Sequence, residues 1–83
     1  MNRAVSTKNP NLFIMVREYI NGYGFFLMKA NNLNFFQFLD GEDKFRKLGL
    51  TPPKKINNFK TIEEARESLK ELAENNNNKL KLN

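Results

Sequence analysis

Residues 12–39 read LFIMVREYINGYGFFLMKANNLNFFQFL and decide the fold of this 83-residue chain. The segment holds eight of the ten aromatic residues, and it is rich in the aromatic and β-branched side chains typical of strands. Asn21-Gly22 divides it, and Asn-Gly between apolar runs is a strong hairpin signal because both residues tolerate positive φ. Asn31-Asn32 can turn the chain again. The pattern predicts three antiparallel strands, at residues 12–20, 23–30 and 33–39.

Both faces of this predicted sheet are apolar. Two-residue turns place Ile20 opposite Tyr23 and Ala30 opposite Leu33, which fixes the faces. One face then carries Ile14, Val16, Tyr23, Phe25, Leu27, Phe36 and Phe38, and the other carries Phe13, Met15, Tyr19, Phe26, Met28, Leu33, Phe35 and Leu39. A sheet covered on one side should alternate apolar and polar residues. We therefore expect the second face to be covered by residues 41–60, by a second copy of the chain, or by a ligand.

Two helices are expected after the strands. Thr61 and Glu64 form a capping box, and the apolar residues that follow recur every three or four positions, which predicts a helix from 61 to about 74 or 75. Residues 42–48 predict a short helix closed by Gly49, with Phe45 and Leu48 packed inward. Residues 54–60 could add an edge strand whose lysines discourage aggregation.

The expected fold is therefore α+β: an antiparallel meander of three or four strands with one C-terminal helix packed on one face. Residues 1–10 are expected to be a flexible arm, residues 11–75 a single domain, and residues 76–83 an Asn-rich tail. Leu80 and Leu82 alternate, so this tail either frays or forms a small extra strand.

Composition excludes much chemistry. The chain has no cysteine and no histidine, which removes disulfides, thiolate catalysis, the commonest zinc ligands and the usual general base. Asp40, Glu42 and Asp43 could bind a metal but are interpreted as solvated turn carboxylates. We expect no enzyme, no metal and no cofactor. No apolar run approaches a membrane span and residues 1–10 lack the apolar core of a signal peptide, so the sequence predicts a cytoplasmic protein with no membrane partner.

The positive charge is uneven. The formal net charge is +5, and residues 41–60 hold six basic side chains against Glu42 and Asp43. The six are Lys44, Arg46, Lys47, Lys54, Lys55 and Lys60. Such a basic loop either attracts phosphate or an acidic protein, or serves solubility alone.

Two partial resemblances bear on function. Residues 21–26, NGYGFF, resemble the RNP1 strand of RNA-binding sheets, and residues 34–38, NFFQF, follow at the spacing found in cold-shock domains of the OB type. Asn21 and Gln37 replace a basic residue and a histidine of that pattern. The resemblance implies that aromatic side chains stack on bases, and the residues it implies are Tyr23, Phe25, Phe35 and Phe38.

Residues 58–65, NFKTIEEA, resemble the strand-to-helix end of AP2-like DNA-binding domains and of phage integrase arm-binding domains. Those domains insert a basic sheet into the major groove, whereas this sheet carries only Arg17 and Lys29. The remaining likeness is to small phage proteins of strands plus one helix, among which are inhibitors of host enzymes, including anti-CRISPR proteins.

The sequence thus leads to two functional hypotheses. In the first, the protein binds single-stranded RNA or DNA without catalysis, through the four stacking aromatics, Arg17 and the basic loop. In the second, it is an inhibitor encoded by a phage or mobile element that binds a host protein or ribonucleoprotein, with a homodimer as one option.

Overall fold

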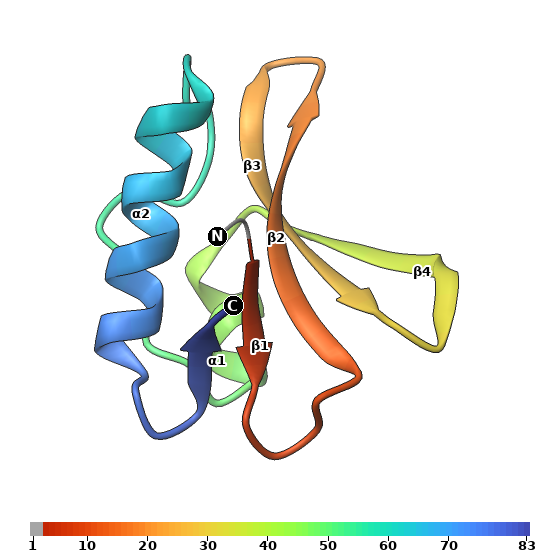
Figure 1. Cartoon of the computed structure of the whole chain (residues 1–83). Helices are drawn as coiled ribbons and strands as arrows, with labels where there is room; N and C mark the ends of the chain where they lie inside the picture. Colours follow the sequence, from red (N-terminus) through yellow and green to blue (C-terminus); the bar gives the residue numbers. More distant parts are fainter. Residues whose placement is uncertain (1–2) are drawn as a thin grey trace.

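The computed structural model describes residues 3–83, which form five strands and two helices (Figure 1). The strands pair antiparallel in one open sheet, in the order β4-β3-β2-β1-β5. In chain order the elements are β1 (Arg3–Ser6), β2 (Leu12–Tyr19), β3 (Gly22–Lys29), β4 (Asn32–Leu39), α1 (Glu42–Lys47), α2 (Ile62–Asn75) and β5 (Leu80–Leu82). This architecture confirms the predicted α+β class with a C-terminal helix packed against an antiparallel meander.

The two ends of the chain complete the sheet. β1 lies between β2 and β5, and Ala4 faces Ile14 on one side and Leu82 on the other. The flexible arm predicted for residues 1–10 is therefore wrong at residues 3–6, and its residues 1 and 2 lie outside the described residues. Of the two alternatives stated for the Asn-rich tail, the structure shows the small extra strand, which is β5. Single-strand patterns could not reveal β1, because four residues gain stability only from the two neighbours they pair with.

The β2–β3 hairpin differs from the predicted register by two positions. Tyr19 pairs with Gly22, so the turn residues are Ile20 and Asn21. Because side chains alternate with a period of two, this shift leaves every β2 and β3 side chain on its predicted face. Gly22 has φ +130°, which favours glycine, and an added Cβ would lie 2.4 Å from the Phe59 carbonyl oxygen.

The β3–β4 hairpin corrects the prediction for β4. Lys29 pairs with Asn32, but the next regular pair is Met28 with Phe36, so the ladder is irregular between them. The extra residues 33–35 shift the register by an odd number of positions, so the side chains that follow in β4 exchange faces. Phe36 and Phe38 consequently lie on the face away from the helices, and Phe35 and Leu39 lie on the helix side, the reverse of the two-residue-turn register.

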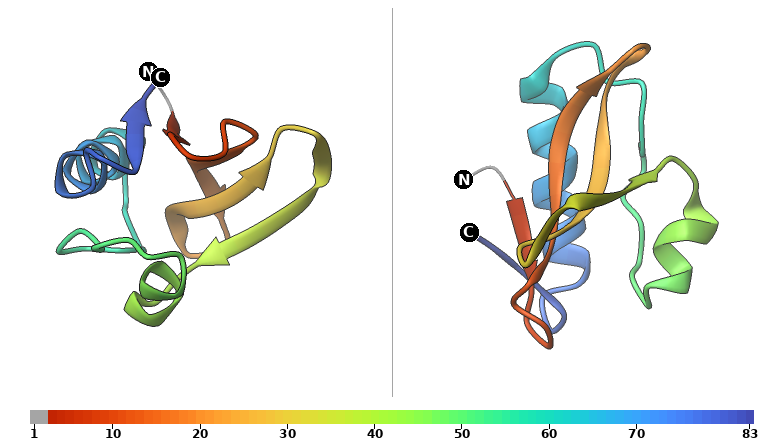
Figure 2. Two further views of the ribbon diagram at one scale, coloured as in Figure 1. Left: turned by 90° about the horizontal axis from the view of Figure 1, so that it is seen from below. Right: turned by 90° about the vertical axis from the view of Figure 1, so that its right-hand side faces the viewer.

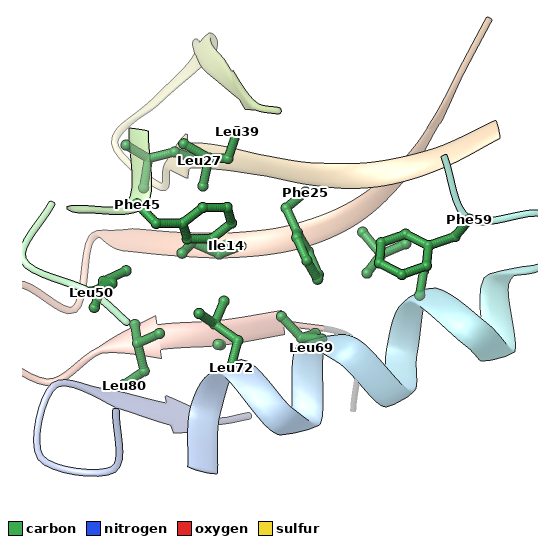
Figure 3. Packing of buried hydrophobic residues seen from close by; sticks show 13 residues of the cluster. Ile14, Phe25, Leu27, Leu39, Phe45, Leu50, Phe59, Leu69, Leu72 and Leu80 are labelled. Carbon is green, nitrogen blue, oxygen red and sulfur yellow. The ribbon is translucent and has the colours of Figure 1, made fainter. Parts of the chain in front are cut away.

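α2 covers one face of the sheet, here called the inner face. Thr61 caps the helix, since its side chain accepts a hydrogen bond from the Glu64 N–H at 3.2 Å. The helix buries Leu69 and Leu72 against the sheet, as Figure 3 shows. The largest fully buried side chains of this core are Phe25, Phe45, Phe59, Ile14, Leu39, Leu69 and Leu72.

The connection between the helices differs from the prediction in two respects. Leu48 stays 37% exposed, and Leu50, placed beyond the left-handed Gly49, is buried instead. The edge strand predicted for residues 54–60 is wrong, because this stretch makes only one bridge, between Tyr23 and Phe59. Asn58 has φ +61°, which interrupts an extended run just before the buried Phe59 ring.

The two helices leave the other face of the sheet open. Phe45 of α1 and Leu69 of α2 belong to the same core cluster, so both helices pack on the inner face. In the right-hand view of Figure 2, α2 lies behind β2 and β3, and β4 crosses in front of these two strands. The far end of the β3–β4 hairpin projects away from the rest of the chain in Figures 1 and 2.

Candidate binding face

The uncovered side of the sheet, here called the outer face, is the candidate site. Its membership follows from the strand registers, since residues directly opposite each other share a face. β5 contributes Lys81 to this face, and β1 contributes Arg3 and Val5. β2 contributes Phe13, Met15, Arg17 and Tyr19. β3 contributes Phe26 and Met28, and β4 contributes Phe36 and Phe38. It combines aromatic, thioether and basic side chains.

Aromatic rings form the floor of the outer face. The Phe26 and Phe38 rings are stacked, with centroids 4.8 Å apart and planes at 15°, and Tyr19 lies 4.6 Å from Phe38. Phe13 and Phe26 are only 7% and 8% exposed, because neighbouring side chains cover them. A second small apolar cluster therefore exists on this side without any helix above it.

Gly24 makes this close packing possible. A Cβ at Gly24 would lie 2.8 Å from Cε1 of Phe38 and 3.1 Å from Cε1 of Tyr19. The glycine thus lets two rings from neighbouring strands meet over the backbone of β3. In this fold Gly22 and Gly24 accommodate groups of the protein itself.

Arginine side chains lie on the aromatic floor. The guanidinium carbon of Arg17 is 5.3 Å from the Phe26 ring centroid and 5.6 Å from that of Phe36, and that of Arg3 is 4.6 Å from Phe13. These are cation–π distances. A guanidinium held by its planar face keeps N–H donors at its edge for an anion.

No carboxylate offsets this charge within the described strands. Glu18 is the one acidic residue in the described strands. It pairs with Tyr23, and the β2–β3 register places both side chains on the inner side of the sheet. Among residues 3–83, the ion pairs involve Lys44, Arg46 and Lys55, none of which is on the outer face. The outer face therefore has a positive potential, and it favours anionic ligands.

Two features give a ligand access. Phe36 is 57% exposed, so much of its ring is available for contact. Beside Arg3 and Lys81 there is a hollow of about 560 Å³, lined also by Val5, Pro10 and Asn83. The exposed ring lies near one edge of the sheet and the hollow at the other, so a ligand could contact both only by crossing the strands.

The structure separates the four predicted stacking residues. Phe25 is fully buried between Phe45 and Phe59, at centroid distances of 5.9 and 5.6 Å, so it cannot stack on a base. Tyr23 and Phe35 pack against the inner core. Only Phe38 lies on the outer face, where it joins the predicted Arg17.

The predicted basic loop lies apart from the outer face, on the helix side. Lys44 binds Asp40 at 2.6 Å, Arg46 binds Glu42 at 3.4 Å, and Lys55 binds Glu64 at 2.6 Å. Lys47, Lys54 and Lys60 are exposed and form no ion pair among the described residues. The aromatic and basic parts of the predicted site are thus not brought together.

Two of these ion pairs lower the pKa of the carboxyl group that they contain. The hydrogen bond from Lys44 lowers the pKa of Asp40, and the hydrogen bond from Lys55 lowers the pKa of Glu64. Both carboxyls therefore remain charged at neutral pH and hold nearby lysines. Asp40 and Glu64 thus neutralise part of the positive charge of the basic loop, on which the prediction that this loop binds nucleic acid depended.

Sequence reasoning missed some residues of the site and reached others. It placed Phe13, Met15, Tyr19, Phe26 and Met28 on one face, as observed. It missed Arg3 and Lys81, because β1 and β5 carry no strand signal strong enough to set a register. It missed Phe36 because nothing in the sequence marks the irregularity at residues 33–35.

Two other features are absent from the described part of the chain. No group of three or more acidic, cysteine or histidine side chains among residues 3–83 could hold a metal ion. None of the helices formed by these residues is long and apolar enough to cross a membrane. No protein-family model, curated protein or solved structure matches the chain.

Proposed function

We propose that the protein binds single-stranded nucleic acid on the outer face of its sheet, without catalysis. The observation that carries this proposal is the pair of arginines lying on an aromatic floor that holds no carboxylate. Single strands are bound by aromatic and guanidinium planes that stack on bases, together with cations that meet the phosphates. The outer face offers both kinds of group on one surface.

The roles of the residues follow from their exposure. Phe36 is the stacking residue, since its ring is the most accessible on this face. Arg17, next to it, offers both a planar surface and hydrogen-bond donors. Arg3 and Lys81 flank the hollow at the other edge and would contact phosphate oxygens.

The size of the face limits the length of the bound strand. Five strands at roughly 4.8 Å spacing give a width of about 19 Å from β5 to β4. This width suits a short site, near the lower end of the ~4–16 nucleotides bound by single-strand binding folds. No outer-face side chain is an amide or carboxylate aimed at base edges, so we expect little sequence preference.

The same face supports a second candidate function, the inhibitor that docks on a host protein. Phe, Tyr and Arg are enriched in protein interfaces, and an exposed ring such as Phe36 can serve as an anchor. In that case an acidic, apolar surface of the partner would cover the outer face.

A titration of a fluorescent 12-nucleotide single strand at low salt tests the proposal. At low salt we expect a Kd tighter than the roughly 10⁻⁶–10⁻⁴ M of nonspecific binding at physiological salt, weaker binding to a duplex, and a steep loss of affinity as salt rises. Phe36→Ala should weaken binding, whereas Leu33→Ala, which removes an exposed apolar side chain on the same strand, should not. No binding at tens of micromolar protein would overturn the proposal in favour of the protein-docking candidate.

A further inference from the structure

A second candidate site lies at one end of the inner core, where Phe13 of the outer face also contributes to the lining. A cavity of about 200 Å³ opens there between the start of β2, the segment after α1, and the start of β5. Its apolar lining includes Leu12, Ile14, Leu27, Leu50 and Leu80. Figure 3 shows the last four of these at the end of the core opposite Phe59.

The rim of this cavity is basic. Lys8, Lys79 and Ser6 line it, and none of the residues that line it is acidic. Neither lysine forms an ion pair within residues 3–83. An apolar interior with uncompensated positive charge at the opening is complementary to a ligand with an apolar chain and an anionic head.

Lys79 is already positioned at the opening. Its Nζ donates a hydrogen bond to the Gly49 carbonyl oxygen at 2.6 Å. An ammonium group has three donors, so two remain for a ligand. Holding the lysine in this way reduces the side-chain entropy that would be lost on binding. Gly49, which follows the C-cap residue Leu48 of α1, adopts a left-handed conformation at φ +75° and carries the carbonyl that Lys79 binds.

The size of the cavity restricts the ligand. Its volume is comparable to that of roughly seven water molecules, too small for a large ring system. We infer that this cavity binds a single medium-length alkyl chain bearing a carboxylate, with the chain against Ile14, Leu27 and Leu50 and the carboxylate at Lys8 and Lys79.

Octanoate is a suitable probe, with octylamine as the matched control of opposite charge. Adding octanoate to the ¹⁵N-labelled full chain should shift the amide resonances of Gly49, Leu50 and Lys79, and octylamine should shift them far less. Butyrate should bind more weakly, because each buried methylene tightens binding about fourfold. Equal effects of octanoate and octylamine, or no shifts up to several millimolar octanoate, would overturn the inference.

Substitutions locate the site. Lys8→Glu should weaken octanoate binding about tenfold, while Lys70→Glu, an exposed reversal on α2, should leave it unchanged. Leu48→Trp should close the opening, because Leu48 lines the cavity and is part-exposed. If Leu48→Trp fails to fold, the two lysine reversals still decide. Equal losses in Lys8→Glu and Lys70→Glu would show nonspecific attraction and refute the site.

Discussion

The hydroxyl of Tyr19 joins the end of β2 to the loop before α2 through Asn58. It donates to Asn58 Oδ1 at 2.7 Å and accepts from the Asn58 backbone N–H at 3.0 Å. Asn58 is left-handed, at φ +61°, and the next residue, Phe59, is fully buried. One phenol therefore holds the turn that directs an aromatic ring into the core.

Tyr19→Phe should destabilise the fold by about 1–2 kcal/mol, because both hydrogen bonds are lost while the ring remains. The free energy of unfolding from urea titration measures this. Tyr23→Phe is the matched control, since the Tyr23 hydroxyl makes no hydrogen bond among the described residues. Equal effects of the two substitutions would show that the contact with Asn58 does not stabilise the turn.

Two glycines should respond differently to alanine. Gly22→Ala combines φ +130° with a Cβ placed 2.4 Å from the Phe59 carbonyl oxygen, so the loop must move. Gly49→Ala has φ +75° but its Cβ meets nothing nearer than Lys79 Nζ at 3.7 Å. We expect Gly49→Ala to cost about 1–2 kcal/mol from the left-handed backbone alone, and Gly22→Ala to cost more. Thermal unfolding followed by circular dichroism would rank them, and the reverse order would contradict the close approach of Phe59.

The docking of α2 is tested by its buried face. Leu69→Ala should cost roughly 2–5 kcal/mol by opening a cavity, and Thr61→Ala about 1 kcal/mol by removing the cap. Both effects appear as shifts in the unfolding midpoint. An unchanged midpoint for Leu69→Ala would mean that the helix is not packed on the sheet.

These elements also show how far the sequence determines the fold. The capping box at Thr61, the apolar stripe of α2 and the composition of residues 12–39 are local signals, and the structure confirms the elements that they predict. β1 and β5 have no comparable signal, because β1 becomes a strand only by pairing with β2 and β5, and β5 only by pairing with β1.

The predicted site failed for a related reason. The assignment of Phe36 and Phe38 depended on a one-residue difference in register, and a single irregularity in β4 reverses it. Phe25 matched a stacking motif, yet it lies opposite two aromatic residues, Phe45 and Phe59, that approach from distant parts of the chain. A motif within one strand cannot reveal what covers that strand.

Acid should weaken the fold through Asp40 and Glu64. Lys44 and Lys55 lower the pKa of these carboxyls in the folded state, so the unfolded chain binds protons more readily. Their contribution is present above the pKa of the unfolded carboxyls and is lost as pH falls through the lower pKa of the folded ones. Urea midpoints measured from neutral pH into the acid range should therefore decrease, and Lys44→Met should make the decrease smaller.

The last prediction separates the outer face from the basic loop as the surface that binds nucleic acid. Arg17→Glu combined with Lys81→Glu reverses two charges on the outer face, whereas Lys47→Glu combined with Lys54→Glu reverses two unpaired charges of the loop. The two double variants have the same net charge, so a general electrostatic attraction would weaken equally in both. If strands bind across the outer face, only the first pair should greatly weaken binding.

The first pair should also reduce the dependence of log affinity on log salt by about 0.7 for each phosphate contact removed. Fluorescence anisotropy across a salt series measures both quantities on one oligonucleotide. A larger loss from Lys47→Glu with Lys54→Glu would assign the binding to the loop, and the arginines on their aromatic floor would then be left for a protein partner.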